Sequence, residues 1–447
     1  MRRLFHVRFV RDFAATGGTQ IFVSFGAMVG GILIARALGP SGKGTISVLV
    51  ALGSMAVTLA SFGVDLSAVY FLGRFKSDRT AVVSNNLLVG VLGGLVTGVL
   101  LAAVGILFHQ QLLRGISTGV FLLFVISVPC LYFNGFAQLI AWGLGRIAGA
   151  NVSGLIEGSS FLLGTAVVLA VIGPHLVPLI ALRVLTAVGI SVFLLLYLRR
   201  VARYQFRPSG RVLRRQLGYG VKNYASSLLW LVLLQSDLVL CNYFLGSGPT
   251  GVYSVAVSLG IPVSMVGAVL GHLIFQRVAS DESRPRRIAN TNRALRVLLP
   301  TLALSAIVLG VSANWLVTLL YGSNFSGAVE ALVLILPGLM ALSFETVLMN
   351  FLAGEGSPSI VYWAPLVGLV INLGANLFVI PRWGINGAAT TSTIGYVVVL
   401  VLVLRHYLRA TRCRPGAVLL LKRGDLQGLW RPGDELSTGL PARAGVT

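Results

Sequence analysis

Residues 38–53 read LGPSGKGTISVLVALG, and residues 245–260 read LGSGPTGVYSVAVSLG. Without a gap the two stretches match at eight of sixteen positions, namely Leu, Gly, Gly, Ser, Val, Val, Leu and Gly. Self-similarity at a separation of 207 residues, close to half of a 447-residue chain, indicates two related halves. The repeat therefore predicts a duplicated fold.

The composition is that of a protein embedded in a membrane. Hydrophobic residues make up 56% of the chain, charged residues only 11%, and the mean hydropathy is +0.87, whereas about 25% of the residues in a soluble domain are charged. Continuous apolar segments of roughly 20 residues suit membrane helices and exclude a barrel, whose strands alternate. We expect an all-α polytopic membrane protein, and an internal repeat in such a chain is typical of a transporter with its substrate path between two halves.

Twelve apolar segments, separated by short loops, are expected to span the membrane as two six-helix lobes related by a parallel pseudo-two-fold axis. The expected lobes are 1–198 and 218–410, joined by a basic cytoplasmic linker at 199–217 and followed by a cytoplasmic tail at 411–447 that is expected to be disordered or to lie on the surface. The linker is expected either to lie on the anionic inner leaflet or to be a solvated connection. The expected spans are 13–37, 45–72, 83–108, 117–142, 147–172, 175–198, 218–244, 250–276, 292–320, 328–352, 358–380 and 385–408.

The basic residues follow this topology. With a cytoplasmic N-terminus, 30 of the 35 Lys and Arg residues lie inside, four lie outside (Arg36, Lys43, Arg114 and Arg382), and Arg183 lies within a span. The positive-inside rule then places both termini in the cytoplasm and favours an even number of spans. The net charge of +22 reflects topology, so we expect no nucleic-acid partner. The three cysteines have no disulfide or metal spacing, and we expect neither metal nor cofactor.

Several short motifs follow one another along the chain. They are Arg36-Ala37-Leu38-Gly39-Pro40 with Gly44, the stretch 61–65, Ser236-Asp237 with Gly246, Gly251 and Tyr253, the stretch 315–325, and Pro381-x-x-Gly384-x-x-Gly387-Ala-Ala. Together they resemble the multidrug, oligosaccharidyl-lipid and polysaccharide flippase superfamily over roughly residues 10–410, and most closely its polysaccharide transporter branch. Apart from the resemblance, the glycines and prolines of these motifs are expected to turn the chain and to let helices pack closely. They are Gly39, Pro40, Gly44, Gly246, Gly251, Pro381, Gly384 and Gly387.

The resemblance implies the function. It implies two lobes that rock about a central cavity and move polyprenyl-pyrophosphate-linked oligosaccharides from the cytoplasmic to the external leaflet of a bacterial inner membrane. It also implies membrane lipids as partners, with a polysaccharide polymerase or export machinery as a further partner. We expect a monomer and no enzymatic activity, because the chain has no motif for phosphate cradling or metal catalysis.

Ionisable groups inside spans are candidate functional residues, because each costs about 2.5–3.5 kcal/mol at the bilayer centre. The cavity candidates are Arg36, Arg183, Glu157, Asp237 and Glu345, followed by Arg146, Lys222 and Asn372. The arginines suit a diphosphate and an acidic sugar, since guanidinium is a permanently charged, bidentate phosphate ligand.

Structural alternatives stay open for each candidate. Arg36, Arg146 and Lys222 lie near an interface where they can snorkel. Asp237 can pin its lobe through an ion pair, Glu157 and Glu345 can be protonated and neutral, and Asn372 can form an interhelical hydrogen bond. From helix geometry, a Glu157–Arg183 pair is expected to be loose at best.

Three rival functions fit the sequence less well than a flippase. A cation-coupled drug or metabolite exporter of the same superfamily usually has an acidic residue in the first helix, and this chain has none there after Asp12. A lipid II flippase is expected to have two further spans, and a sugar polymerase to have a long external loop. The exporter is the nearest alternative.

Overall fold

The computed structural model describes residues 2–75, 78–202, 205–279, 283–356, 359–422 and 425. Within these ranges the chain is helical and has no strand, as expected for an all-α membrane protein. The helices are α1 (Arg2–Ser61), α2 (Val64–Arg74), α3 (Arg79–Leu107), α4 (His109–Leu112), α5 (Thr118–Val125), α6 (Val128–Gly143), α7 (Ile147–Ser159), the π-helix η2 (Ser160–Gly164), α8 (Thr165–Val171), α9 (Leu176–Ala202), α10 (Gly210–Leu245), α11 (Ser247–Ala279), α12 (Arg284–Tyr321), the 3₁₀ helix η3 (Ser323–Phe325), α13 (Ala328–Gly354), α14 (Ile360–Thr411) and α15 (Gly416–Leu419).

Ten helices in the described ranges are long and apolar enough to cross a membrane, which makes this a multi-pass membrane protein. Two of the ten are unusually long, with 46 residues at Thr16–Ser61 and 52 at Ile360–Thr411. At about 1.5 Å per residue each exceeds the roughly 30 Å hydrocarbon core. Both contain a glycine in a non-helical conformation, Gly39 (φ 68°, ψ −170°) and Gly384 (φ 60°, ψ −141°). The count of twelve spans stays a prediction, which these two interruptions support.

The two copies of the repeat have the same backbone conformation where the chain turns. Gly246, between α10 and α11, has φ 85° and ψ −179°, close to the values of Gly39. Positive φ is accessible to glycine at little cost, which explains why both copies carry it.

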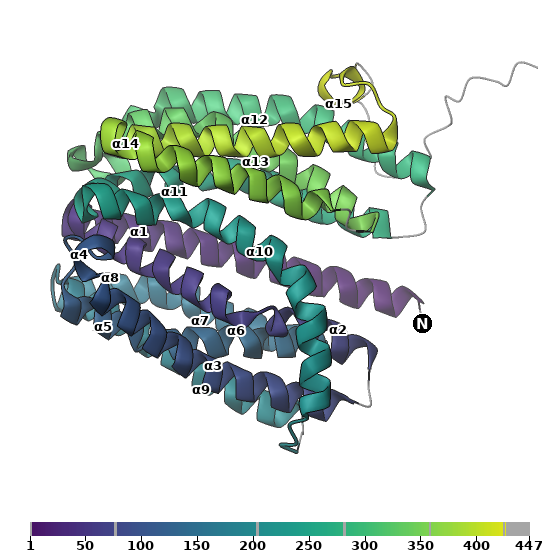
Figure 1. Ribbon diagram of the computed structural model, residues 1–447, viewed down its shortest axis with the longest axis horizontal. Helices are drawn as coiled ribbons and strands as arrows, with labels where there is room; N and C mark the ends of the chain where they lie inside the picture. The colour runs from purple at the N-terminus through teal and green to yellow at the C-terminus, as the bar shows by residue number, and fades with distance from the viewer. Residues whose placement is uncertain are drawn as a thin grey trace, which may run out of the picture.

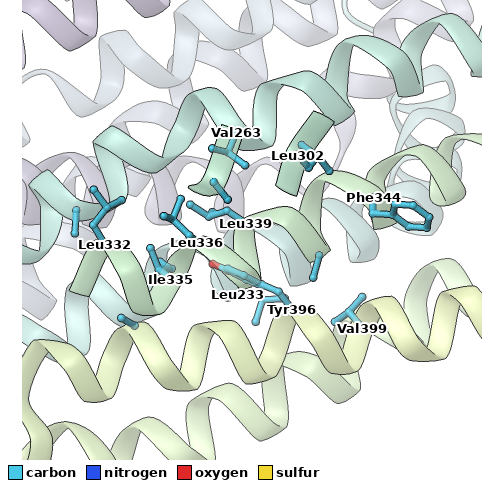
Figure 2. Packing of buried hydrophobic residues seen from close by; sticks show 14 of the residues in the cluster. Leu233, Val263, Leu302, Leu332, Ile335, Leu336, Leu339, Phe344, Tyr396 and Val399 are labelled. Carbon is cyan, nitrogen blue, oxygen red and sulfur yellow. The ribbon is translucent and has the colours of Figure 1, made fainter. Parts of the chain in front are cut away.

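The hydrophobic core divides along the sequence. The largest buried cluster draws on residues 233–418, with only Ala35 and Ala51 added from α1. Figure 2 shows part of this cluster, where Val263, Leu339 and Tyr396 fill the space between α11, α13 and α14. The other clusters draw on residues 34–198, with Val212 added from α10. The division into two lobes stays a prediction, and this segregation supports it.

The helix that contains the seventh expected span begins earlier than that span, because α10 starts at Gly210 and not at 218, while its candidate membrane span is Tyr224–Leu245. Figure 1 shows the start of α10 crossing the ends of the N-half helices before the helix turns to run with the others. Val212 and Gln216 are buried there, and Gln216 Nε2 donates to Ser67 Oγ at 3.2 Å. Residues 210–217 are therefore helical with one buried face, and whether the linker lies on the inner leaflet stays a prediction.

The first part of the tail contacts α12. α15 folds back along α12, and Asp425 accepts hydrogen bonds from Arg296 Nε at 2.6 Å and Nη2 at 2.7 Å. Residues 412–422 thus have a defined conformation beside α12, and disorder of the tail as a whole stays a prediction, because residues 426–447 lie outside the described residues.

Candidate functional site

A small cavity lies inside the N-terminal half and contains two of the predicted site residues. Its volume is about 50 Å³, and Arg183 and Glu157 contribute its ionisable groups. Apolar residues from α1, α5 and α9 form most of the wall, with the Ser160 and Thr186 hydroxyl groups between them. Since water needs about 10–15 Å³ and polar partners, the cavity has room for a few waters or a small ion.

Local structure explains how these side chains meet. Helices α7 and α8 are joined by the π-helix η2, a widened turn that is frequent at functional sites. Helix α1 approaches this turn closely, because a Cβ added at Gly30 would lie 2.6 Å from the Phe161 carbonyl oxygen. The hydroxyl groups of Ser160 and Thr186 hydrogen-bond across the gap between η2 and α9.

Arg183 is held in the cavity without a carboxylate partner. Its Nε is buried and has no hydrogen-bond partner, and its guanidinium carbon lies 5.9 Å from the centroid of the Phe161 ring. Among the described residues no carboxylate lies within 4 Å of this guanidinium, so Glu157 shares the cavity without forming an ion pair. Cation–π attraction offsets part of the cost of burial.

Asp237 lies in a separate polar network in the C-terminal half. It accepts hydrogen bonds from Tyr253 Oη at 2.5 Å, Leu238 N at 2.8 Å and Ser392 Oγ at 3.1 Å. Asn372 joins through Ser392, to which its Nδ2 donates at 3.4 Å, and accepts from Asn376 Nδ2 at 3.0 Å. Both carboxylate oxygens thus accept from uncharged donors, and within the described ranges Asp237 forms no ion pair; the hydrogen bonds of Asn372 favour its interhelical interpretation.

The described residues contain no cluster of metal-ligating side chains. In the described ranges no group of three or more His, Cys, Asp and Glu side chains is placed to hold a metal ion. The oxygens of the Asp237 network are the type that hard cations prefer, but they are already paired with protein donors.

Glu345 does not join either site. Glu345 lies in α13 with 1% of its surface exposed, and its Oε1 has no hydrogen-bond partner. Lys222 lies in α10, and its side chain lies outside the described residues.

Arg36 has a role that neither sequence interpretation foresaw. It is exposed and donates from Nε to the Leu320 carbonyl at 2.9 Å and from Nη2 to the Leu319 carbonyl, in the last turn of α12. Arg114, which sequence reasoning placed only as an external residue, donates in the same way to Phe244 O at 2.8 Å, near the end of α10. Two arginines of the N-terminal half therefore cap helices of the C-terminal half, where a cation also meets a favourable dipole. The only hint in the sequence was that so few basic residues, these two among them, lie on the external side.

The two repeat copies contact each other at the same end of the molecule. A Cβ added at Gly44 would collide with the Ser247 carbonyl oxygen, and one added at Gly251 would collide with the Pro40 carbonyl oxygen. Gly44 and Gly251 are thus required for the close approach of α1 and α11, which supports their expected packing role.

At the opposite end the halves also meet. A Cβ at Gly63 would lie 2.5 Å from the Gly220 carbonyl oxygen, and the rings of Tyr70 and Tyr219 stack with centroids 4.3 Å apart. Tyr224 Oη donates to Leu59 O at 2.7 Å. This end also carries Arg79, Arg146 and the start of α10, and we call it the arginine-rich end; it lies on the right in Figure 1.

Comparison with known proteins agrees with this fold. A family model described as "Polysaccharide biosynthesis protein" matches residues 9–275. The chain is 26% identical over 200 residues to an uncharacterised membrane protein, MJ1068, of Methanocaldococcus jannaschii, covering 43% of this chain and 39% of that one. It is 22% identical over 225 residues to a probable low-salt glycan biosynthesis flippase, Agl15, of Haloferax volcanii, covering 49% and 47%. The matched regions span less than half the length of these curated relatives.

Solved structures share the fold across most of the chain. A lipid II flippase MurJ in an inward closed conformation matches with a TM-score of 0.70 and 12% identity, covering 88% of this chain and 87% of that one. An inward-facing multidrug resistance MATE family transporter of the MOP superfamily matches with a TM-score of 0.69 and 16% identity, covering 87% and 94%. These neighbours are transporters and flippases and not enzymes, and the family model covers more than half of the sequence. The chain therefore belongs to the polysaccharide biosynthesis protein family and has the fold of the multidrug, oligosaccharidyl-lipid and polysaccharide superfamily.

Proposed function

We propose that this protein is a flippase that moves polyprenyl-diphosphate-linked oligosaccharides from the cytoplasmic to the external leaflet. Family membership links the chain to polysaccharide biosynthesis, and the fold is that of membrane transporters. The matched relative that is named as a probable glycan biosynthesis flippase supports a lipid-linked glycan as cargo.

The observation that carries the proposal is that the two halves contact each other at both ends of the molecule. At one end, Arg36, Arg114 and the glycine contact of α1 with α11 join them. At the arginine-rich end, Tyr70, Tyr219 and Tyr224 join them. Opening one set while the other stays closed exposes the surfaces between the halves to one side of the membrane at a time, which is alternating access.

A gene deletion tests the cargo. In cells that lack the protein, labelled lipid-linked oligosaccharide should accumulate on the cytoplasmic leaflet, where a membrane-impermeant glycosidase cannot reach it in intact spheroplasts. Polymer export should fall in parallel. Unchanged export together with an unchanged leaflet distribution would contradict the proposal.

A cation-coupled exporter is the second candidate, favoured by one observation. The buried Asp237 network lies deep in the C-terminal half, and a carboxylate inside a membrane is a default site for a coupling ion. Overexpression should then raise drug resistance and leave the leaflet distribution of lipid-linked sugars unchanged. The flippase proposal expects the reverse pattern.

A further inference from the structure

A second pocket lies at the arginine-rich end of the N-terminal half, apart from the cavity of Arg183. It has a volume of about 160 Å³ and is lined by Arg79, Thr80, Val83, Leu144, Arg146, Val201 and Ala202. These residues come from α3, the α6–α7 turn and the end of α9. One part of the wall is cationic and the other part is apolar.

The chain brings the two arginines together from separate helices. Gly145 has φ 70°, so the chain reverses sharply after α6 and delivers Arg146 immediately before α7. The Tyr197 hydroxyl contacts the Arg146 carbonyl oxygen at 3.4 Å and ties this turn to α9. Arg79 is the first residue of α3, and its Nε lies 3.4 Å from the Leu72 carbonyl oxygen, which orients the guanidinium.

The pocket's positive charge is not neutralised by neighbouring acids. Within the described ranges neither guanidinium has a carboxylate within 4 Å. The adjacent Asp78 faces Arg215, with Oδ2 and Nη1 3.8 Å apart. An anion in the pocket would thus meet two permanent cations without displacing a protein carboxylate.

Further donors surround the same space. Both α3 and α7 begin at the pocket, and neither helix has a side-chain cap on its first amides. The N-terminus of a helix favours negative charge, and the Thr80 hydroxyl adds one more donor. Guanidinium, hydroxyl and amide donors together match the several acceptor oxygens of a phosphate group.

We propose that this pocket binds the phosphate group of an amphiphile at the membrane surface. The apolar side chains of Val83, Leu144 and Val201 suit the start of a hydrocarbon chain beside the charged group. Basic pockets between membrane helices bind lipid headgroups by this chemistry. The phosphate can come from an anionic phospholipid of the leaflet or from the diphosphate of a lipid-linked cargo before loading. The site does not depend on the proposed function, because binding is measured without transport.

The test uses the full-length protein in mixed micelles of phosphatidylcholine and phosphatidylglycerol. Native mass spectrometry measures the retained phosphatidylglycerol, and a thermal shift titration measures binding of inorganic diphosphate. The pocket variant is Arg79→Gln with Arg146→Gln. The matched control, Arg211→Gln with Arg214→Gln, removes the same charge from exposed positions near the start of α10 at the same end of the molecule.

The pocket variant should weaken binding at least about tenfold, since two charge-assisted contacts are lost, while the control changes it by less than about twofold. Retained phosphatidylglycerol without a diphosphate response identifies a leaflet headgroup, and a diphosphate response identifies the diphosphate of a cargo. If the first variant does not fold, Thr80→Val should weaken binding a few-fold while keeping the pocket's shape. Equal losses in the pocket and control variants, or no loss in the pocket variant, would overturn the proposal.

Discussion

At the scale of single residues, Arg183 is the strongest candidate for a functional side chain. The sequence predicted a cation within a span, and the structure places it in a small cavity with an unpartnered Nε. The position of the cavity could not be predicted from the sequence. All of its lining residues belong to 34–190, so the cavity lies inside the N-terminal half.

Replacing Arg183 tests its role in transport. Arg183→Ala should lower the rate of cargo translocation at least about tenfold without loss of membrane insertion, because the buried cation is removed. Arg382→Ala is the control, since it removes an exposed arginine whose Nη1 donates only to Phe378 O of its own helix, at 3.0 Å. Reconstituted vesicles with lipid-linked oligosaccharide provide the assay. Full activity of Arg183→Ala would exclude Arg183 from the site.

Asp425 controls the docking of the tail onto α12. The Arg296 guanidinium lowers the pKa of Asp425 from 3.8 to about 2. Because the carboxylate form is favoured in the docked state, the stabilisation is complete above pH 3.8 and is lost as the pH falls through about 2. Amide exchange over 412–422, corrected for intrinsic rates, should therefore be protected at pH 4 as at pH 7.

The variant Asp425→Asn should remove this protection and speed amide exchange over 412–422 about tenfold at pH 7. Asp78→Asn, which removes a weaker and more exposed contact with Arg215 in the other half, should have no effect there. Protection that survives in Asp425→Asn would mean that other contacts hold the tail.

Arg36 illustrates why some residue roles cannot be derived from sequence. Its type and position predicted either phosphate binding or snorkelling. The carbonyl groups it caps lie 283 and 284 residues away in the chain. No local pattern encodes a partner that only tertiary packing supplies.

At the scale of helices, the effect of replacing a glycine by alanine depends on which atoms lie next to it. Gly251→Ala should lower the thermal unfolding midpoint, because its Cβ would collide with the Pro40 carbonyl oxygen, and overpacking costs about 1–3 kcal/mol. Gly189→Ala is the matched control in α9, where nothing lies within 4 Å of an added Cβ. It should leave the midpoint unchanged or raise it slightly, since alanine stabilises a helix by about 0.5–1 kcal/mol relative to glycine. Equal midpoints for the two variants would contradict the close contact.

Other glycines show how much of the helix arrangement can be predicted from the sequence. Turns at Gly39, Gly246 and Gly384 were predicted, because glycine and proline interrupt apolar segments there. The start of α10 was not, since a run of arginines is typical of a loop as much as of a helix that buries one face. The π-helix η2 was missed as well, because one residue inserted into a turn leaves no compositional signal.

At the scale of the whole molecule, the halves should separate where the repeat copies meet. A Cβ at residue 248 would lie 3.5 Å from Ser41 Oγ, so Ser41→Cys with Gly248→Cys should form a disulfide between the halves on oxidation. Oxidation should abolish translocation, and a reductant should restore it. The control pair, Thr19→Cys with Gly154→Cys, links α1 and α7 within one half, where the Cβ would lie 3.1 Å from Thr19 Cγ2. Translocation that continues with the first pair oxidised would contradict separation at this end.

The contact between the repeat copies has a reciprocal geometry. The seventh residue of each copy, Gly44 or Gly251, faces the carbonyl of the third residue of the other, Ser247 or Pro40. An isologous interface of a two-fold homodimer has this property, since residue i meets j and j meets i. Gly44→Ala and Gly251→Ala should accordingly cost the same stability, as two equivalent sites of a dimer would, and clearly unequal costs would show that the copies have diverged in energy as well as in sequence.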